Sequence, residues 1–184
     1  VNTMDISRTV IPNSLPRQRL DAGTFGTLGV GTGFALAAAV WCRDHEPERR
    51  VICIQGDSAF GFSGMEVETV CRYRLPIIFV IINNNGLTQS FDEEGFQKIE
   101  GTDLLFMSPP TVLQPNAHYE KMIEAFGGNG YFCKTPEEIQ KSLSAAVRSK
   151  TQASLVNIMI NTMADRQEQV NRYRNNFYIH VNRM

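Results

Sequence analysis

The sequence predicts an α/β fold, in which helices cover both faces of a doubly wound, mostly parallel sheet. Apolar, strand-sized runs alternate with helix-like segments along most of the chain, an order typical of doubly wound domains. The runs at residues 51–55 and 77–82 are apolar at almost every position, which favours strands that are covered on both faces. Each of these runs is followed at once by a polar cluster. Ligands bind outside the carboxyl ends of the strands in such folds, so these clusters are the first candidates for a functional site.

Length and composition agree with one globular domain. The chain has 184 residues, of which 42% are hydrophobic and 20% are charged, values typical of a domain with a buried core. A formal net charge of −1 provides no field that would attract nucleic acid. No apolar run approaches the ~18 residues that a membrane helix requires, so we expect no membrane span.

The domain is assigned to residues 1–164, and residues 165–184 are assigned to a polar C-terminal tail. The chain begins with Val1 rather than Met. This start predicts a fragment or a processed piece of a longer protein.

The individual elements follow from local pattern. Residues 1–19 are polar and rich in turn formers, which predicts a loop with a short helix. Thr135 followed by Pro136 predicts a helix start, with threonine as the N-cap and proline at the first helical position. Residues 85–115 lose periodicity, which predicts a long irregular loop of the kind that often forms a lid or binding loop. We expect helices at residues 34–41, 63–72, 119–126 and 136–150, and strands at residues 51–55, 77–82, 130–134 and 155–160.

Five glycines fall between residues 23 and 33. A dinucleotide fingerprint needs G-x-G-x-x-G directly after a strand. The third position falls on Phe34 when counted from Gly29 and on Leu36 when counted from Gly31, so the fingerprint is absent. Two interpretations remain: the glycines let a helix pack closely against the sheet, or they form a loop whose backbone approaches a cofactor.

Asp57 and Asn84 are the strongest candidates for ligand binding. Asp57 lies in a Gly-Asp-Ser tripeptide after the first apolar run, and Asn84 lies in an Asn-Asn-Asn-Gly tetrapeptide after the second. One carboxylate and one amide oxygen suit a hard cation such as Mg²⁺ that also holds a diphosphate. Backbone N–H groups of residues 58–61 could bind phosphate oxygens, with help from a helix that starts near residue 63. The alternative is that Asp57 is only a turn or capping residue.

Other reactive side chains form no recognisable catalytic set. The four cysteines include no C-x-x-C pair, which favours buried free thiols in a reducing compartment over a metal cluster or a disulfide frame. The three histidines lack ligand spacing, so we expect surface or hydrogen-bonded roles. No G-x-S-x-G elbow surrounds Ser58 or Ser63, which leaves serine hydrolase chemistry unsupported.

Longer strings carry a family resemblance. They are Asn-Thr-Met-Asp at residues 2–5, Arg-Leu-Asp-Ala-Gly-Thr-Phe-Gly at 19–26, the segment Gly-Asp-Ser-Ala-Phe-Gly-Phe-Ser-Gly-Met-Glu-Val-Glu-Thr at 56–69 with Cys-Arg-Tyr at 71–73, and Ala-Phe-Gly-Gly at 125–128. With the Gly-Asp-Ser and Asn-Asn pairing, which looks like the thiamine diphosphate motif, they resemble the 2-hydroxyacyl-CoA lyase family and, less closely, its relative oxalyl-CoA decarboxylase. The likeness extends over nearly the whole chain and is weakest at residues 87–115 and 161–184.

The resemblance implies a role for each candidate residue. Asp57, the side chain of Asn84 and the carbonyl of Gly86 are implied to bind Mg²⁺. Leu28 is implied to wedge thiamine diphosphate into a bent shape, and the Gly26 carbonyl to accept a hydrogen bond from its aminopyrimidine. The bend brings the 4′-imino nitrogen to the thiazolium C2 proton, where it acts as an intramolecular base. The implied cofactor-binding set is Gly26, Leu28, Gly56, Asp57, Ser58, Ala59, Asn84 and Gly86.

The same resemblance implies an activity and a set of partners. The family cleaves a 2-hydroxyacyl-CoA to formyl-CoA and an aldehyde one carbon shorter, with the thiazolium ring as an electron sink. The glutamate that activates the pyrimidine ring belongs to an N-terminal domain that this chain does not contain, so we expect no catalytic residue here and no activity of the chain alone. The cofactor would lie between this domain and the pyrimidine-binding domain of another subunit, which implies a homodimer or homotetramer. Two alternatives remain: an oxalyl-CoA decarboxylase, or a truncated non-catalytic chain that only binds the cofactor or partner subunits.

The chain departs from the family pattern at a few positions. Leu87-Thr88 follows the Asn-Asn-Asn-Gly cluster where the family has Ile-Tyr, Ser90 replaces a glycine, and Gln55 stands where glutamate is expected. The missing tyrosine implies altered substrate contacts near the thiazolium, with the metal site kept.

The C-terminal tripeptide predicts a location. Asn182-Arg183-Met184 places a basic residue before a terminal apolar one and is similar to the S-K-L class of peroxisomal address. We therefore expect a peroxisomal protein, with the cytoplasm as the alternative.

Overall fold

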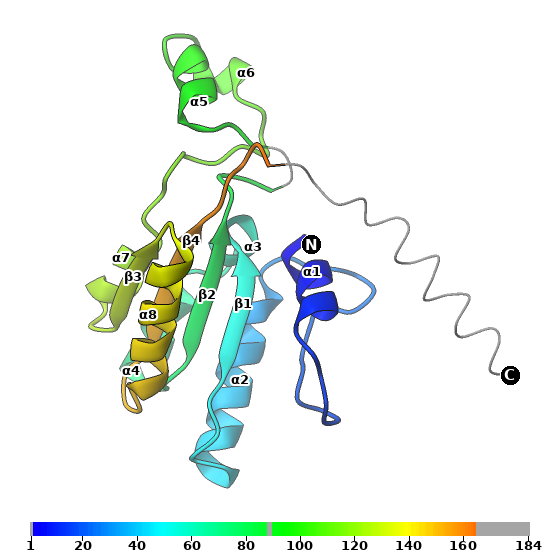
Figure 1. The fold of residues 1–184 in the computed structure, drawn as a ribbon, viewed down its shortest axis with the longest axis vertical. Coiled ribbons are helices and arrows are strands. Elements are labelled where there is room, and N and C mark those ends of the chain that lie inside the picture. The colour runs from blue at the N-terminus through cyan, green and yellow to red at the C-terminus, as the bar shows by residue number, and fades with distance from the viewer. Residues whose placement is uncertain (1, 88–89, 165–184) are drawn as a thin grey trace, which may run out of the picture.

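A four-stranded parallel sheet forms the centre of the structure, a computed structural model that describes residues 2–87 and 90–164. The strands are β1 (Ile52–Gly56), β2 (Ile78–Asn83), β3 (Asn129–Cys133) and β4 (Ser154–Met159), and their order across the sheet is β1-β2-β4-β3 (Figure 1). Every neighbouring pair is parallel. The α/β class and the parallel sheet that the sequence predicts are confirmed.

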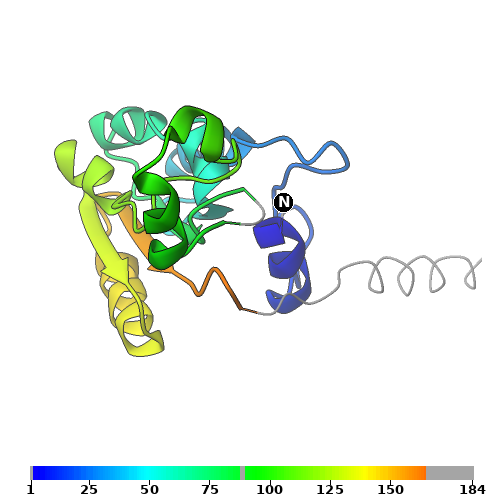
Figure 2. The same cartoon turned by 90° about the horizontal axis from the view of Figure 1, so that it is seen from above.

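Helices cover both faces of this sheet. One layer consists of α2 (Val30–His45), α4 (Glu66–Arg72) and α7 (Glu120–Ala125), and the opposite face is covered by α8 (Pro136–Arg148). Figure 2 shows α8 and the layer of α2 and α4 on opposite sides of the strands. Successive side chains of a strand point to opposite faces. Accordingly, Phe79 of β2 packs in the first layer and Val80 packs against α8.

The N-terminal half departs from the prediction around residues 57–66. The helix expected at residues 63–72 is α4, which begins at Glu66, and a separate short helix, α3 (Asp57–Gly61), precedes it across a turn. As a result, a helix begins directly at Asp57 rather than near residue 63. The short helix expected within residues 1–19 is α1 (Asn2–Val10), which contacts β1.

The expected irregular loop at residues 85–115 contains two helices, so that part of the prediction was wrong. They are α5 (Glu93–Glu100) and α6 (Leu104–Met107), and they extend above the carboxyl ends of the strands in Figure 1. Asp92 and Asp103 cap them by accepting hydrogen bonds from backbone N–H groups. Neither helix has a fully buried residue, and the two helices are only eight and four residues long, which is too short for a clear helical periodicity in the sequence.

Three further expectations concern a membrane span, the C-terminal tail and Thr88. Within the described residues, no helix is both long and apolar enough to cross a bilayer. The tail assigned to residues 165–184 and the departure at Thr88 lie outside the described residues.

Candidate functional site

The polar clusters that follow β1 and β2 meet at one edge of the sheet. The two strands are paired in parallel so that Gly56 lies opposite Ile82. Asp57 therefore begins α3 just beyond β1, and Asn84 lies just beyond the end of β2. This is the carboxyl edge of the sheet, where doubly wound folds bind their ligands.

The Asp57 carboxylate is directly bonded to the loop that carries Asn84. Its Oδ2 accepts a hydrogen bond of 2.8 Å from the backbone N–H of Gly86, and its Oδ1 accepts one of 2.7 Å from Ser58 N–H. The side chain is buried, with 1% of Asp57 exposed. Burial raises the pKa of Asp57, and hydrogen bonds from the backbone N–H groups of Ser58, Gly86 and Asn84 oppose part of this rise. Because Asp57 forms no ion pair in the described part of the chain, a bound cation would relieve the cost of its buried charge.

The loop of residues 83–86 is fixed by its own side chains. Asn83 Oδ1 accepts a hydrogen bond from Asn85 N–H (3.1 Å), and Asn83 Nδ2 donates to the Ala117 carbonyl (3.1 Å). Asn85 has a φ of 60°, a left-handed conformation that asparagine tolerates better than most residues. Asn85 Oδ1 accepts from Asn116 N–H at 3.0 Å. Two of the three asparagines are thus committed to loop structure.

The third asparagine is available for a ligand. The half-buried side chain of Asn84 makes no hydrogen bond to any described residue. An amide oxygen without a protein partner, next to a buried carboxylate, matches the oxygen-ligand chemistry of hard cations. Across residues 2–87 and 90–164, no group of three or more His, Cys, Asp or Glu side chains is placed to hold a metal ion. A cation here would therefore rely on Asp57, on amide and carbonyl oxygens, and on its phosphate ligand.

Gly86 completes the loop through its backbone. It forms an isolated antiparallel bridge with Val112, and Leu87 N–H donates to the Thr111 carbonyl at 2.9 Å. A Cβ atom at Gly86 would lie 2.5 Å from the Thr111 carbonyl oxygen. Since this distance is far below a normal contact, only glycine fits, and its own carbonyl remains a possible oxygen ligand.

The Gly-Asp-Ser side of the site shows features that suit a phosphate group. The buried Ser58 hydroxyl lies close enough to Asp57 to lower the pKa of that carboxyl slightly, but it has no hydrogen-bond partner with normal geometry. A buried hydroxyl without a partner is costly, so a ligand oxygen beside it would be stabilising. Ala59 is half-buried on α3, and a Cβ at Gly56 would approach Thr3 Oγ1 of α1 at 3.3 Å. The residues present therefore fit a bound diphosphate and cation.

The glycine-rich segment divides between the two interpretations left open by the sequence. Gly31 lies inside α2, where a Cβ would come within 2.9 Å of Gln55 Oε1, so this glycine serves close packing of helix on sheet. Gly26 and Gly29 lie in the preceding loop with φ values of 60° and 88°. Ser63 Oγ donates to the Gly29 carbonyl at 2.7 Å. The loop that carries Gly26 and the half-buried Leu28 is thereby held against the turn after α3.

Gln55, where the resemblance implies glutamate, lies in the interior of the domain. Gln55 is buried in β1 beneath α2, and its Nε2 donates to Thr32 Oγ1 at 3.1 Å. It therefore lies within the helix–sheet packing. Ser90, where the resemblance implies glycine, donates a hydrogen bond from Oγ to the Asn85 carbonyl and braces the loop of residues 83–86.

Tyr119 lies at the same edge of the sheet, but no sequence pattern marks it as part of the site. Burial, and then the charge of Asp57, raise the pKa of Tyr119 to about 12. Its ring packs edge-on against Phe60 of α3, with centroids 5.8 Å apart. In the sequence it looks like an ordinary helix residue, and only the fold brings it near Asp57.

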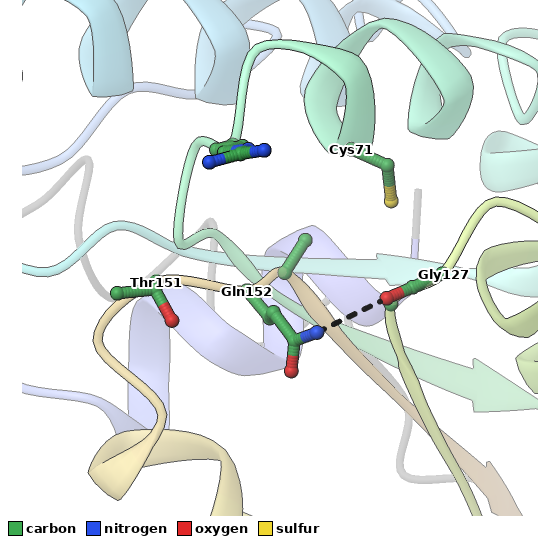
Figure 3. A pocket seen from close by; sticks show the side chains of 7 residues that line it. Cys71, Gly127, Thr151 and Gln152 are labelled. Carbon is green, nitrogen blue, oxygen red and sulfur yellow. Dashed lines mark hydrogen bonds between the residues drawn. The ribbon is translucent and has the colours of Figure 1, made fainter.

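A pocket of the described residues lies elsewhere. It has a volume of about 310 Å³ and is lined by Cys71 of α4, by Arg74 just after that helix, and by segments at the amino ends of β3 and β4. Figure 3 shows Gln152 in this pocket, donating a hydrogen bond to the Gly127 carbonyl. Because ligands of doubly wound folds bind at the opposite ends of the strands, we place the candidate site at Asp57.

The buried thiols that the sequence predicts are found at three of the four cysteines. Cys42, Cys53 and Cys133 are buried, whereas Cys71 is half-buried. His45 stacks on Trp41, and His118 is hydrogen-bonded to Glu120. His180 lies outside the described residues.

Comparison with known proteins identifies related chains. Residues 2–158 match the family model described as "Thiamine pyrophosphate enzyme, C-terminal TPP binding domain", thiamine pyrophosphate (TPP) being another name for thiamine diphosphate. The chain is 57% identical to 2-hydroxyacyl-CoA lyase 1 from Homo sapiens over 169 residues, covering 91% of this chain and 29% of the relative. It is 40% identical to oxalyl-CoA decarboxylase from Escherichia coli over 165 residues, covering 89% of this chain and 27% of that relative. The chain thus spans less than a third of the length of either relative.

A solved structure shares the fold. Benzoylformate decarboxylase from Polynucleobacter necessarius superimposes with a TM-score of 0.55 and 20% sequence identity, covering 77% of this chain and 25% of that chain. At this identity the similarity concerns the fold alone.

Proposed function

The chain belongs to the thiamine pyrophosphate enzyme family, as a C-terminal TPP-binding domain, and on this premise we propose that it binds the diphosphate of the cofactor together with Mg²⁺ in a 2-hydroxyacyl-CoA lyase. The complete enzyme would cleave a 2-hydroxyacyl-CoA to formyl-CoA and an aldehyde one carbon shorter. The observation that carries the proposal is the bond between the buried Asp57 carboxylate and Gly86 N–H, because it joins both halves of the binding motif. The 57% identity to the human lyase supports the choice of reaction.

In this proposal, three oxygen atoms of the chain bind the cation: a carboxylate oxygen of Asp57, the side-chain oxygen of Asn84 and the carbonyl oxygen of Gly86. The buried hydroxyl of Ser58 and the backbone around Gly56 and Ala59 receive the diphosphate. Mg²⁺ usually binds through one or two side chains together with phosphate oxygens, which agrees with this small donor set. When bound, the thiazolium ring would supply an electron sink for carbon–carbon cleavage.

The glycine-rich loop has the second task of orienting the cofactor. Leu28 would support the bent shape, and the Gly26 carbonyl would accept a hydrogen bond from the aminopyrimidine. The bond from Ser63 to Gly29 holds this loop in place. The chain's own contribution is therefore binding and orientation, which provides proximity between reacting atoms.

The catalytic partner would be another domain, from the same polypeptide or from another subunit of a homodimer or homotetramer. Phe25, Phe62 and Met65, from the glycine-rich loop and from the turn after α3, are 96%, 72% and 64% exposed. Large exposed apolar side chains grouped beside a site are typical of an interface. A domain that covers them would bring the activating glutamate that the family resemblance implies, and would leave room for the acyl-CoA substrate.

The test uses the complete enzyme and calorimetric titration with thiamine diphosphate in the presence of Mg²⁺. We predict that Asp57→Ala abolishes Mg²⁺-dependent binding, since loss of a direct ligand should exceed the ~100-fold loss seen when an outer partner of a metal ligand is removed. Asp103→Ala is the matched control, because Asp103 also accepts a backbone hydrogen bond but does so at the start of the exposed helix α6. Unchanged affinity in Asp57→Ala would refute the assignment of the site.

A second candidate reaction is the decarboxylation of oxalyl-CoA, supported by the 40% identity to the Escherichia coli enzyme. The two reactions are separated by measuring formyl-CoA release from oxalyl-CoA and from a long-chain 2-hydroxyacyl-CoA. Faster release from oxalyl-CoA would favour the decarboxylase.

For location, we propose the peroxisome on the basis of the final Asn182-Arg183-Met184, which lies outside the described residues. Deleting these three residues from a fluorescent fusion is expected to move the protein to the cytoplasm. Peroxisomal retention after the deletion would contradict the proposal.

A further inference from the structure

A fully buried asparagine lies in the middle of β4, among apolar residues. Asn157 is 0% exposed, and its strand neighbours Val156 and Ile158 are buried as well. Burying an amide in an apolar strand costs free energy unless the amide is hydrogen-bonded. Asn157 Oδ1 has no hydrogen-bond partner among the residues that the structure describes, so part of this cost is retained there.

The amide nitrogen of Asn157 joins two elements beyond the strand. Nδ2 donates to the Ala117 carbonyl at 2.9 Å and to Glu120 Oε2 at 2.8 Å. Glu120 is itself buried at 5% exposure, and its other carboxylate oxygen is 2.5 Å from His118 Nδ1. Asn157 thereby fixes the start of α7 and the residues before it to the sheet.

The same Ala117 carbonyl is bonded to the candidate metal loop. It accepts a hydrogen bond of 3.1 Å from Asn83 Nδ2, so Asn83 and Asn157 share one acceptor. Asn85 is held by the same segment, because Asn116 N–H donates to Asn85 Oδ1 at 3.0 Å and Leu113 N–H donates to the Asn85 carbonyl at 2.8 Å. Both neighbours of Asn84 are therefore tied to residues 113–117, which Asn157 ties to β4.

We propose that Asn157 is a positioning residue, which acts through the Ala117 carbonyl and Asn83 to hold the loop of residues 83–86 where Asn84 can bind the cation together with Asp57. The inference rests on the proposed function of that loop, and it adds that the geometry of the loop depends on Asn157. Outer partners that orient metal ligands commonly affect metal affinity strongly. An amide retained at a cost inside an apolar strand is consistent with such a role, since a hydrophobic side chain would suit packing alone.

The test compares Asn157→Leu with wild type in the complete enzyme. Leucine keeps the number and branching of side-chain heavy atoms and removes both donated hydrogen bonds. At fixed thiamine diphosphate, the Mg²⁺ concentration for half-saturation, measured by calorimetry, is expected to rise ~10- to 100-fold. Enzyme turnover is expected to recover at excess Mg²⁺, whereas simple damage to the fold would lower the maximal rate at every Mg²⁺ concentration.

Ser154→Ala is the matched control. Ser154 is also fully buried on β4 and its hydroxyl has no partner, but it lies at the amino end of the strand, opposite Ile78. Its Mg²⁺ half-saturation should stay within about twofold of wild type, as expected for a distant site. A wild-type value in Asn157→Leu, or an equal shift in Ser154→Ala, would overturn the inference.

If Asn157→Leu does not fold, hydrogen exchange of the wild-type enzyme tests the same coupling. Amide hydrogen exchange is followed with and without Mg²⁺ and thiamine diphosphate. Protection is expected at the amides of Leu113 and Asn116 together with Gly86, and protection at Gly86 alone would refute the coupling. Wild-type enzyme that shows no Mg²⁺-dependent binding would refute the proposed function itself, which distinguishes the two failures.

Discussion

At the scale of single residues, the Asp57 carboxyl group both stabilises the fold and is a proposed Mg²⁺ ligand. Its oxygens accept backbone hydrogen bonds from Ser58 and Gly86, which join the start of α3 to the loop after β2. Burial raises its pKa, so the ionised form is destabilised until a positive charge lies nearby. A substitution of Asp57 therefore removes both a proposed ligand and a connection between two strand ends.

Gly86→Ala tests whether the backbone at the site tolerates any side chain. A Cβ atom would lie 2.5 Å from the Thr111 carbonyl oxygen, so we expect destabilisation by about 1–3 kcal/mol, as for other overpacked sites. Denaturant unfolding of the wild type and the variant measures the difference.

Gly33→Ala is the control for the Gly86 substitution, because a Cβ at Gly33 in α2 meets no atom within 4 Å. It should be neutral or stabilising by up to roughly 1 kcal/mol, since alanine favours a helix over glycine. Equal stability of Gly86→Ala and wild type would contradict the steric argument.

Tyr119 gives a pH-dependent prediction. Burial and the charge of Asp57 raise its pKa from 10.0 to about 12, so the folded protein favours the neutral phenol. The resulting contribution to stability is fully present below pH 10 and is lost as the pH rises towards 12. The difference in absorbance at 295 nm between wild type and Tyr119→Phe should titrate near the higher value, and a midpoint near that of a free tyrosine would contradict the burial of this ring.

Residue identity alone could predict only part of the site. Asp57 and Asn84 could be predicted because their polar clusters directly follow two apolar strands, whereas the role of Gly86 was implied by the family resemblance alone. The positioning role of Asn157 was not, because a single asparagine within the run at residues 155–160 carries no signal about its partners. Those partners, Ala117 and Glu120, are distant in sequence and meet Asn157 only through the parallel sheet.

At the scale of elements, the sequence predicted a helix correctly where a capping motif and a buried apolar face occur together. Thr135 forms a capping box with Glu138, and α8 begins at Pro136 as the sequence predicts. The same helix buries an apolar face against Val80 and Val156. By contrast, α5 and α6 are capped but contain no fully buried residue, and at eight and four residues they are too short to show a sustained apolar pattern, so they were not predicted.

Thr135→Ala should destabilise the protein by about 1 kcal/mol, the usual cost of an N-cap. The threonine hydroxyl accepts the hydrogen bond from Glu138 N–H, and alanine leaves that donor without its partner. Thermal unfolding provides the measurement, and Thr151→Ala, in an exposed turn before β4, provides the control. A midpoint equal to that of the control would show that the capping box adds nothing to stability.

At the scale of the whole molecule, the domain presents an incomplete surface. Leu105, Phe106 and Met107 of the α6 region are 85%, 81% and 55% exposed, and they lie above the same edge of the sheet as the site. The chain also spans only 29% of its human relative. Both observations agree with the proposal that other domains or subunits cover this edge.

The isolated 184-residue chain is therefore predicted to have no lyase activity. In the proposed function the chain supplies residues that bind and orient the cofactor, and the activating glutamate is proposed to come from another domain. Formyl-CoA release is assayed with the isolated chain and with the complete enzyme at equal concentration, and circular dichroism verifies that the chain is folded. Turnover by the isolated chain would contradict the division of tasks proposed for the two domains.

The segment that carries α5 and α6, here called the excursion, starts and ends at a single paired base, and this pairing affects how changes in its length are tolerated. Gly86 bridges to Val112, and Leu87 N–H bonds to the Thr111 carbonyl, so the excursion leaves and rejoins the domain at one place. Closing a loop of twice the length costs only about 0.6 kcal/mol more. We therefore expect the excursion to tolerate changes in length, as long as its paired base is kept.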